Sequence, residues 1–392
     1  MADPKSLQTS LTHSDYTPPE GFAAFPPPIH HASTVLFENV AAMRSRQWQD
    51  KSSYTYGLHG TPTTFILEAR LAAIEGGTHC TLAPSGLAAI AMLDFALLKS
   101  GDDVLIPDNA YYPNRELGDW LARDFDISAR YYDPMTGSGI SALIQPNTKL
   151  IWTEAPGSVS MEVPDIPAIC RAAHERGVVV ALDNTWSAGI AFRAFDHGVD
   201  IVMHALTKYQ SGGSDVLMGA LITRDEALQR KIQLAHMRLG FNVGMDDVYL
   251  TLRGLSTLKV RFDAHDAAAR MVAGWLAERA EVAVMLHPAY PDCPGHAIWL
   301  RDFNGAGGLF SVILDAQFTE AQTDAFVDSL RLFKIGYSWG GAHSLCLPYR
   351  MQGMREGWTH QGTLVRFYIG LEDPRDLIAD IEQAMKSALI PA

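Results

Sequence analysis

The ends of several short apolar runs in the middle of the sequence carry side chains that could do chemistry. The run VVVALD ends at Asp183, and the run DIVMHALTK ends at Lys208. Two earlier runs, VLIPD and LIWTEAP, lead to Tyr111 and to Glu154. Ligands bind beyond the carboxyl ends of strands in an open parallel sheet, because loops and helix N-termini converge there. If these runs are strands, we expect the four side chains to border one ligand site.

A predicted helix start supplies an anion site to the same region. The segment TLAPSGLAAIAML places Ser85, Gly86 and Leu87 at the beginning of a helix, where free backbone N–H groups attract a phosphate. An acid, a lysine, an aromatic ring and a phosphate cradle are the parts needed to hold pyridoxal phosphate. The lysine forms a Schiff base with the aldehyde, and the acid keeps the pyridine nitrogen protonated. A poorly solvated lysine has a lowered pKa, which suits proton transfer.

Each of these residues also has a simpler structural explanation. Asp183 could cap a turn, and Lys208 could pair with a carboxylate or extend to water. The segment around Ser85 could be an ordinary helix cap, and Tyr111 could serve packing alone. Their common position at the ends of consecutive runs favours a ligand site.

An arginine near the end of the chain could hold a substrate. In TLVRFYIGL, Val365 and Phe367 fall on one face of a predicted strand and Arg366 on the other. If the first face is buried, Arg366 points away from that core, either to solvent or into a cleft, where it could bind a carboxylate through two parallel hydrogen bonds. An amino-acid substrate requires such a contact.

The elements that must position these residues follow from the hydrophobic pattern. Residues 59–252 alternate unbroken apolar runs with amphipathic helices, which is typical of a parallel sheet covered on both faces. Residues 253–392 mix helical and strand-like segments, and residues 1–58 contain PPEGFAAFPPPIHH with little helical periodicity. The sequence therefore predicts an α/β protein with an extended arm (1–58), a cofactor-binding α/β domain (59–252) and a smaller α+β domain (253–392).

Composition excludes several classes of function. Lys plus Arg number 31 against 44 Asp plus Glu, and a net charge of −13 argues against nucleic acid or an anionic membrane as the main partner. The four cysteines form no CxxC pair, so neither a metal site nor a disulfide framework is predicted, and a reducing cytoplasm is the expected compartment. No targeting segment is apparent, and no run is followed by a GxGxxG turn, which disfavours a nucleotide-dependent oxidoreductase. A small-molecule partner fits best.

A set of motifs resembles one enzyme family. The motifs are YGLHGTPT (56–63), APSGLAA (83–89), LDNTWSAG (182–189), ALTKYQSGGSD (205–215), YSWGG (337–341) and LVRFYIGLED (364–373). Together they resemble the Cys/Met-metabolism enzymes that depend on pyridoxal phosphate, and YSWGG with SMEVPDIPA is closest to the cystathionine β-lyase branch. The resemblance implies a fold-type-I enzyme that forms a homotetramer, a dimer of dimers, with active sites shared between subunits.

The resemblance also implies roles for single residues. Lys208 would be the Schiff-base lysine and would move the Cα proton, and Asp183 would be the partner of the pyridine nitrogen. Tyr111 would stack on the cofactor, and Arg366 would anchor the substrate carboxylate. The remaining implied residues are Gly86, Leu87 and Thr207 at the phosphate, Tyr56 reaching the phosphate in the neighbouring subunit, and Ser338, Trp339 and Tyr337 beside the substrate.

The implied reaction is cleavage of L-cystathionine to homocysteine, pyruvate and ammonia in methionine biosynthesis, with cystine and related β-substituted cysteines as further substrates. A γ-lyase, a γ-synthase or a methionine γ-lyase of the same family is the alternative; a non-catalytic ligand-binding protein has little support. Three positions depart from the pattern of many relatives. Leu58 stands where they have arginine, Ala205 where they have serine, and Ala342-His343 where an acidic residue often precedes Ser-Leu.

Overall fold

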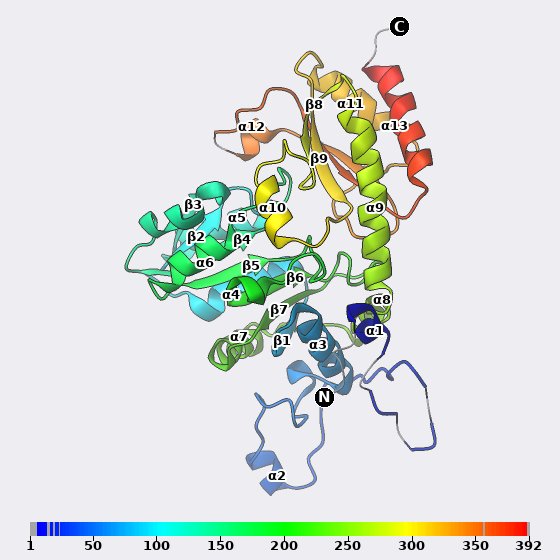
Figure 1. Ribbon diagram of the computed structural model, residues 1–392. Helices are drawn as coiled ribbons and strands as arrows, with labels where there is room; N and C mark the ends of the chain where they lie inside the picture. Colours follow the sequence, from blue (N-terminus) through cyan, green and yellow to red (C-terminus); the bar gives the residue numbers. More distant parts are fainter. Residues whose placement is uncertain (1–5, 14–15, 19, 23, 356, 390–392) are drawn as a thin grey trace.

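The computed structural model of the protein describes residues 6–13, 16–18, 20–22, 24–355 and 357–389. Two β-sheets organise the chain, a seven-stranded sheet followed by a four-stranded one (Figure 1). No helix in these described ranges is apolar over enough residues to span a membrane. The predicted α/β class, with a mostly parallel sheet and a smaller α+β region, is confirmed.

The large sheet has the strand order β1-β7-β6-β5-β4-β2-β3, and all its strands run in one direction except β7. Its strands are β1 (His79–Ala83), β2 (Asp103–Pro107), β3 (Ser128–Tyr132), β4 (Thr148–Glu154), β5 (Val179–Asp183), β6 (Ile201–Ala205) and β7 (Gly219–Thr223). The elements around it are α3 (Pro62–Glu75), α4 (Gly86–Leu97), α5 (Tyr112–Phe125), η2 (Pro134–Ala142), α6 (Ile166–His174), η3 (Ala194–His197) and α7 (Glu226–Leu239).

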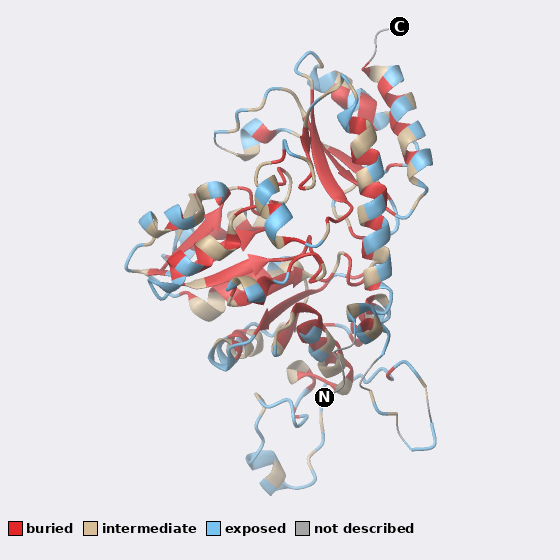
Figure 2. Cartoon of the chain, viewed as in Figure 1, coloured by how far each residue is buried: buried red, intermediate tan, exposed pale blue. Residues whose placement is uncertain are grey.

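Both faces of the large sheet are buried, which explains the unbroken apolar runs. Leu182 and Val202 belong to one hydrophobic cluster, whereas Ala181 and Met203 belong to another on the opposite face. Figure 2 shows the strands of both sheets as buried, with exposed residues on the outer sides of the helices. Because β5 and β6 lie side by side in parallel, their carboxyl ends open at the same edge.

The small sheet is antiparallel in the order β10-β11-β9-β8. Its strands are β8 (Val282–Leu286), β9 (Leu309–Leu314), β10 (Leu345–Tyr349) and β11 (Leu364–Tyr368). The helices of this half are α8 (Met245–Leu255), α9 (Leu258–Ala277), α10 (His296–Asp302), α11 (Glu320–Asp328), α12 (Met351–Met354) and α13 (Pro374–Ala388). The long α9 packs on β8 of the small sheet and extends from there to α8 (Figure 1). The predicted boundary between residues 252 and 253 lies inside α8, and the division into domains stays a prediction.

The N-terminal arm is extended over most of its described length but contains α1 (Leu7–Thr12), α2 (Val40–Arg44) and η1 (Gly57–His59). The sequence pattern did not indicate α1 and α2, which are short and depend on local capping. The Ser6 hydroxyl accepts the N–H of Thr9, and the Asn39 side chain accepts the N–H of Ala42. The part of the arm that carries α2 projects away from the body (Figure 1).

Candidate active site

A cleft of about 1030 Å³ lies at the carboxyl edge of the large sheet. The segments that follow β1, β2, β4, β5 and β6 line one side of it, and β10, β11 and their flanking segments line the other. A cleft of this volume accommodates a cofactor together with a small substrate.

Lys208 follows β6 and extends into this cleft. Its Nζ donates a hydrogen bond to Ser338 Oγ at 2.8 Å and lies 5.2 Å from the centre of the Trp339 ring. Burial, together with the nearby charge of Arg366, lowers the pKa of Lys208 to about 8. Roughly a tenth of this amine is therefore uncharged at pH 7, far more than at the ordinary pKa of lysine, and the uncharged form is the one that a nucleophile and a base require.

Asp183 is the last residue of β5 and borders the same cleft. One of its carboxylate oxygens accepts the backbone N–H of Thr185 at 3.0 Å, and the Thr185 hydroxyl accepts the N–H of Ala205 on β6 at 2.9 Å. Burial raises the pKa of Asp183, although the bonds to Thr185 and the charge of Lys208 oppose that shift. Asp183 forms no ion pair within 4.0 Å to any described residue, so the site holds a buried carboxylate that has room for a cation.

The helix that was predicted to provide an anion site begins at Gly86 as α4. The Ser85 hydroxyl caps the helix by accepting the N–H of Ala88 at 3.0 Å, which leaves the N–H groups of Gly86 and Leu87 without partners inside the helix. Gly86 packs closely on β6, because a Cβ at Gly86 would lie 2.8 Å from the Cβ of Ala205. Gly86, Leu87 and Thr207 all border the cleft.

Arg366 enters the cleft from β11 on the opposite side. Val365 and Phe367 pack in the core of the small sheet, and Arg366 is only 8% exposed on the other face, as the alternation predicted. Its guanidinium lies 5.1 Å from the Tyr349 ring centre, and it forms no ion pair with a carboxylate of the described chain. Burial lowers its pKa. A buried guanidinium without a carboxylate partner is suited to bind a substrate carboxylate.

One cleft is thus bordered by Lys208, Asp183, the start of α4 and Arg366. This arrangement agrees with the match of the chain to a protein-family model. The model for Cys/Met metabolism pyridoxal-phosphate-dependent enzymes covers residues 8–386. The chain belongs to this family. Its dependence on pyridoxal phosphate and its fold-type-I architecture are therefore confirmed as predicted.

Relatives of the chain agree with the assignment to the pyridoxal-phosphate family. A putative cystathionine β-lyase of Rhizobium johnstonii is 44% identical over 97% of this chain and 96% of the relative. A cystathionine β-lyase of Haemophilus influenzae is 38% identical over 96% and 97% of the two chains. A solved cystathionine γ-synthase of Xanthomonas oryzae pv. oryzae, in complex with aminoacrylate and cysteine, has a TM-score of 0.89 and 30% identity over 98% of this chain and 99% of that one.

The residues present fit the cofactor of the pyridoxal-phosphate family. The free N–H groups at Gly86 and Leu87 match a phosphate, and the buried Asp183 carboxylate matches a cationic ring nitrogen. The Lys208 amine lies in the same cleft for attachment to the aldehyde. Ala205 contributes only a methyl group beside Gly86, so the phosphate site lacks a hydroxyl at this position.

The YSWGG segment lies beside Lys208. Ser338 has a φ of 97°, a strained conformation for a residue with a side chain, and its hydroxyl accepts the Lys208 hydrogen bond. A Cβ at Gly340 would lie 2.6 Å from the backbone of Lys208, so this glycine permits the approach. Trp339 packs on Tyr209 with ring centres 5.4 Å apart. Tyr337 is 84% exposed and lies at the mouth of the cleft.

Tyr111 and Tyr56 occupy different surroundings. Tyr111 precedes α5 and borders the cleft, and burial together with Asp183 raises the pKa of its hydroxyl. Tyr56 is 48% exposed on the arm and is absent from the lining of its own chain's cleft. The structure therefore brings together all the predicted site residues except Tyr56.

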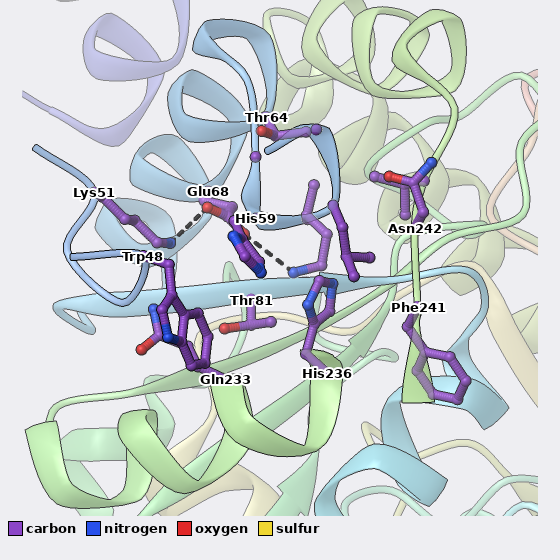
Figure 3. Close-up of a pocket in the computed structure, with 15 residues that line it drawn as sticks. Trp48, Lys51, His59, Thr64, Glu68, Thr81, Gln233, His236, Phe241 and Asn242 are labelled. Atoms are coloured by element: carbon purple, nitrogen blue, oxygen red, sulfur yellow. Dashed lines mark hydrogen bonds and ion pairs between the residues drawn. The ribbon is translucent and has the colours of Figure 1, made fainter. Parts of the chain in front are cut away.

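The base of the arm is docked on its own body, as Figure 3 shows. Lys51 forms an ion pair with Glu68 at 2.5 Å and donates to the carbonyl oxygen of Cys80 at 2.6 Å. The His59 ring lies 4.9 Å from that of Trp48 and borders a small pocket of about 40 Å³ together with Leu58. His59 and Leu58 thus contact the body of their own chain beside Tyr56, and neither borders its own cleft.

A buried ion-pair cluster at the cleft mouth was not predicted from the sequence. Arg355, just after α12, pairs with Asp108 at 2.9 Å and with Glu162, two residues that follow strands of the large sheet. Arg115 of α5 donates to the carbonyl oxygen of Met354 in the same segment. These bonds fasten the segment between β10 and β11 to the large sheet. A lone arginine in an aperiodic segment gave no signal for such contacts.

Replacing Arg355 by alanine should lower the free energy of unfolding by about 3–5 kcal/mol, because it leaves two carboxylates without their cation. The Arg355 side chain is 13% exposed and that of Glu162 7% exposed, so water replaces the lost partner poorly. Urea unfolding of both proteins measures the change. Arg375→Ala is the control, since the side chains of Arg375 and of its partner Asp373 are 80% and 39% exposed and their pair should contribute little to the free energy of unfolding. Equal losses in the two variants would contradict a buried cluster.

Proposed function

We propose that this chain is a pyridoxal-phosphate-dependent carbon–sulfur β-lyase that cleaves L-cystathionine to homocysteine, pyruvate and ammonia, a step of methionine biosynthesis. Cystine and related β-substituted cysteines are proposed as further substrates. The observation that carries the proposal is the convergence of Lys208, Asp183 and Arg366 on one cleft. The relatives named cystathionine β-lyase support this reaction over the others of the family.

The chain's own residues divide the work as follows. Gly86, Leu87 and Thr207 would hold the phosphate of the cofactor, and Asp183 would hold its ring nitrogen. When bound, pyridoxal phosphate supplies an electron sink for the bond broken at the substrate Cα. Arg366 binds the α-carboxylate of the substrate and so orients Cα toward Lys208.

Proton transfer is assigned to Lys208. Its uncharged amine takes the proton from Cα, and Ser338 Oγ, 2.8 Å from Nζ, keeps the amine in place. The Cβ–S bond then breaks, and homocysteine leaves as its thiol after receiving a proton from Lys208 or from Tyr111. The raised pKa of Tyr111 keeps its hydroxyl protonated at neutral pH, as a donor requires. Hydrolysis of the remaining fragment yields pyruvate and ammonia.

The alternative is γ-elimination or γ-replacement, which requires a second proton from Cβ before the γ-substituent leaves. The similarity to a solved cystathionine γ-synthase keeps this class open. Incubation with L-cystathionine and identification of the keto acid distinguish the two. We expect pyruvate and homocysteine, with none formed by the Lys208→Ala variant. Formation of 2-oxobutyrate and cysteine would instead assign the chain to the γ-lyases.

We further propose a cytoplasmic homotetramer, a dimer of dimers, in which Tyr56 completes the phosphate site of a neighbouring subunit. The arm supports a shared interface, because Phe25 and Leu36 are 95% and 89% exposed in the isolated chain. The four cysteines are unpaired, as in a reducing compartment. Light scattering of the purified protein measures the number of subunits.

A further inference from the structure

A second buried carboxylate, Glu154, lies beside Asp183 and has no part in the steps above. Glu154 ends β4 and Asp183 ends β5, and the two residues are paired across the parallel strands. Adjacent strands lie only about 4.8 Å apart. Both residues are 9% exposed, and both border the cleft. Two negative charges at such positions would repel each other in poorly solvated surroundings.

The contacts of the two carboxylates differ. Glu154 Oε2 accepts the backbone N–H of Tyr111 at 2.7 Å, and no described lysine, arginine or histidine pairs with Glu154 within 4.0 Å. Asp183 instead accepts the Thr185 N–H and lies near Lys208, whose positive charge favours its ionised form. The single proton that the pair must retain therefore belongs on Glu154.

The titrating and polar groups around Glu154 support this assignment. Burial is the main cause that raises the pKa of Glu154 well above its ordinary 4.5, and the Asp183 charge raises it further. The Tyr111 N–H and the Ser158 hydroxyl oppose the shift only in part. Glu116 of α5 adds a further negative charge near Tyr111.

We propose that Glu154 is a positioning residue that stays a neutral carboxylic acid. Asp183 is then the single anion of the pair that binds the cofactor nitrogen. The backbone N–H of Tyr111 donates to an uncharged acceptor, which holds this residue in place. The inference rests on the cofactor of the family and is independent of which sulfur amino acid is cleaved. Glutamine has the shape of the neutral acid and retains an oxygen for the Tyr111 N–H.

Neutral Glu154 makes stability depend on pH with a definite sign. Because its folded pKa is raised, the folded chain keeps a proton that the unfolded chain loses above about pH 4.5. The contribution of Glu154 to stability is thus full below that pH and declines as the pH rises toward the folded pKa. A glutamine side chain does not titrate, so Glu154→Gln should melt at a higher temperature than wild type at neutral pH, and the difference should shrink toward about pH 4.5.

The experiment compares the melting temperatures of the wild-type and Glu154→Gln holoenzymes, saturated with cofactor, from about pH 5 to pH 8. Absorbance titration gives the cofactor Kd, which should change by less than about threefold because the neutral side chain is conserved. Infrared difference spectra should show a protonated carboxyl band at neutral pH that Glu154→Gln lacks. None of these measurements depends on turnover of cystathionine, so failure of the proposed reaction leaves them unaffected.

Glu162→Gln is the matched control, because Glu162 is also buried but pairs with Arg355. This variant should melt at a lower temperature than wild type at neutral pH. The rise in melting temperature caused by Glu154→Gln should also be smaller in a protein that carries Asp183→Asn, since the neighbouring negative charge is then gone. A melting temperature lowered as much as in Glu162→Gln, or a cofactor Kd raised more than about tenfold, would overturn the proposal.

A second measurement serves if Glu154→Gln does not fold. Asp94 is a further buried acid, away from the pair, whose pKa is raised to about 7 because burial outweighs its bond from Trp152. In Asp94→Asn the two acids of the pair, Asp183 and Glu154, remain, and ¹³C labelling of the glutamate carboxyl groups separates them. A protonated carboxyl band at neutral pH that shifts with labelled glutamate supports the proposal, and a band that does not shift, or no band, refutes it.

Discussion

Substitution of Lys208 by alanine should lower turnover of every substrate by at least about 10⁴-fold, because one amine provides both the covalent link to the cofactor and the base at Cα. Lys208 Nζ contacts the Ser338 hydroxyl and the Trp339 ring, and neither of these groups can replace an amine. Borohydride reduction followed by peptide mapping should fix the cofactor to wild-type Lys208 and leave it unfixed in the variant. Keto-acid release measures the loss of activity.

Lys208→Arg separates the chemistry of the amine from its charge. Arginine keeps a positive charge near Asp183 but does not lose its proton at accessible pH, so it serves neither as a nucleophile nor as a base. We expect this variant to be as inactive as Lys208→Ala. Turnover within about tenfold of wild type in Lys208→Arg would show that only a charge is needed at this position.

The positions of Asp183 and Lys208 in the site could be predicted from the sequence because the large sheet is buried on both faces. Unbroken apolar runs show roughly where strands end: Asp183 is the last residue of β5, and Lys208 lies shortly after the end of β6. The face of the strand on which Arg366 lies was predictable for a similar reason. Successive side chains of a strand point to opposite faces, and both neighbours of Arg366, Val365 and Phe367, are apolar. In each case the pattern of apolar residues along the chain predicts where the side chain lies.

The remaining features depend on contacts that have no local period. Arg355 meets Asp108 and Glu162 across the cleft mouth, and nothing in the spacing of these three residues reports that they meet. The neutral role inferred for Glu154 needed the strand register that puts it next to Asp183, because a glutamate in a sequence is otherwise assumed to be charged. The short helices of the arm depend on single capping side chains, which carry little signal in so polar a segment.

Substitution of Arg366 by alanine should reduce kcat/KM for amino-acid substrates by about 10²–10³-fold, since the loss of one partner from a buried charge pair costs about 2–5 kcal/mol. Arg366 is 8% exposed, and no carboxylate of the described chain neutralises it, so its charge is available to the substrate. Arg366→Lys should recover only part of the loss, because an ammonium lacks the planar pair of donors that grips a carboxylate. Cofactor absorbance should be unchanged in both variants.

Two comparisons decide whether Arg366 acts on the substrate carboxylate or only on local structure. Arg350→Ala removes an arginine from the same cleft, but its side chain is 81% exposed and pairs with Glu320, so kcat/KM should stay within about threefold of wild type. A substrate analogue that lacks the α-carboxylate should react equally slowly with wild type and with Arg366→Ala, because the contact is already absent. If Arg366→Ala slowed the analogue as much as the amino acid, the arginine would be supporting the cleft wall, and the carboxylate site would have to lie elsewhere.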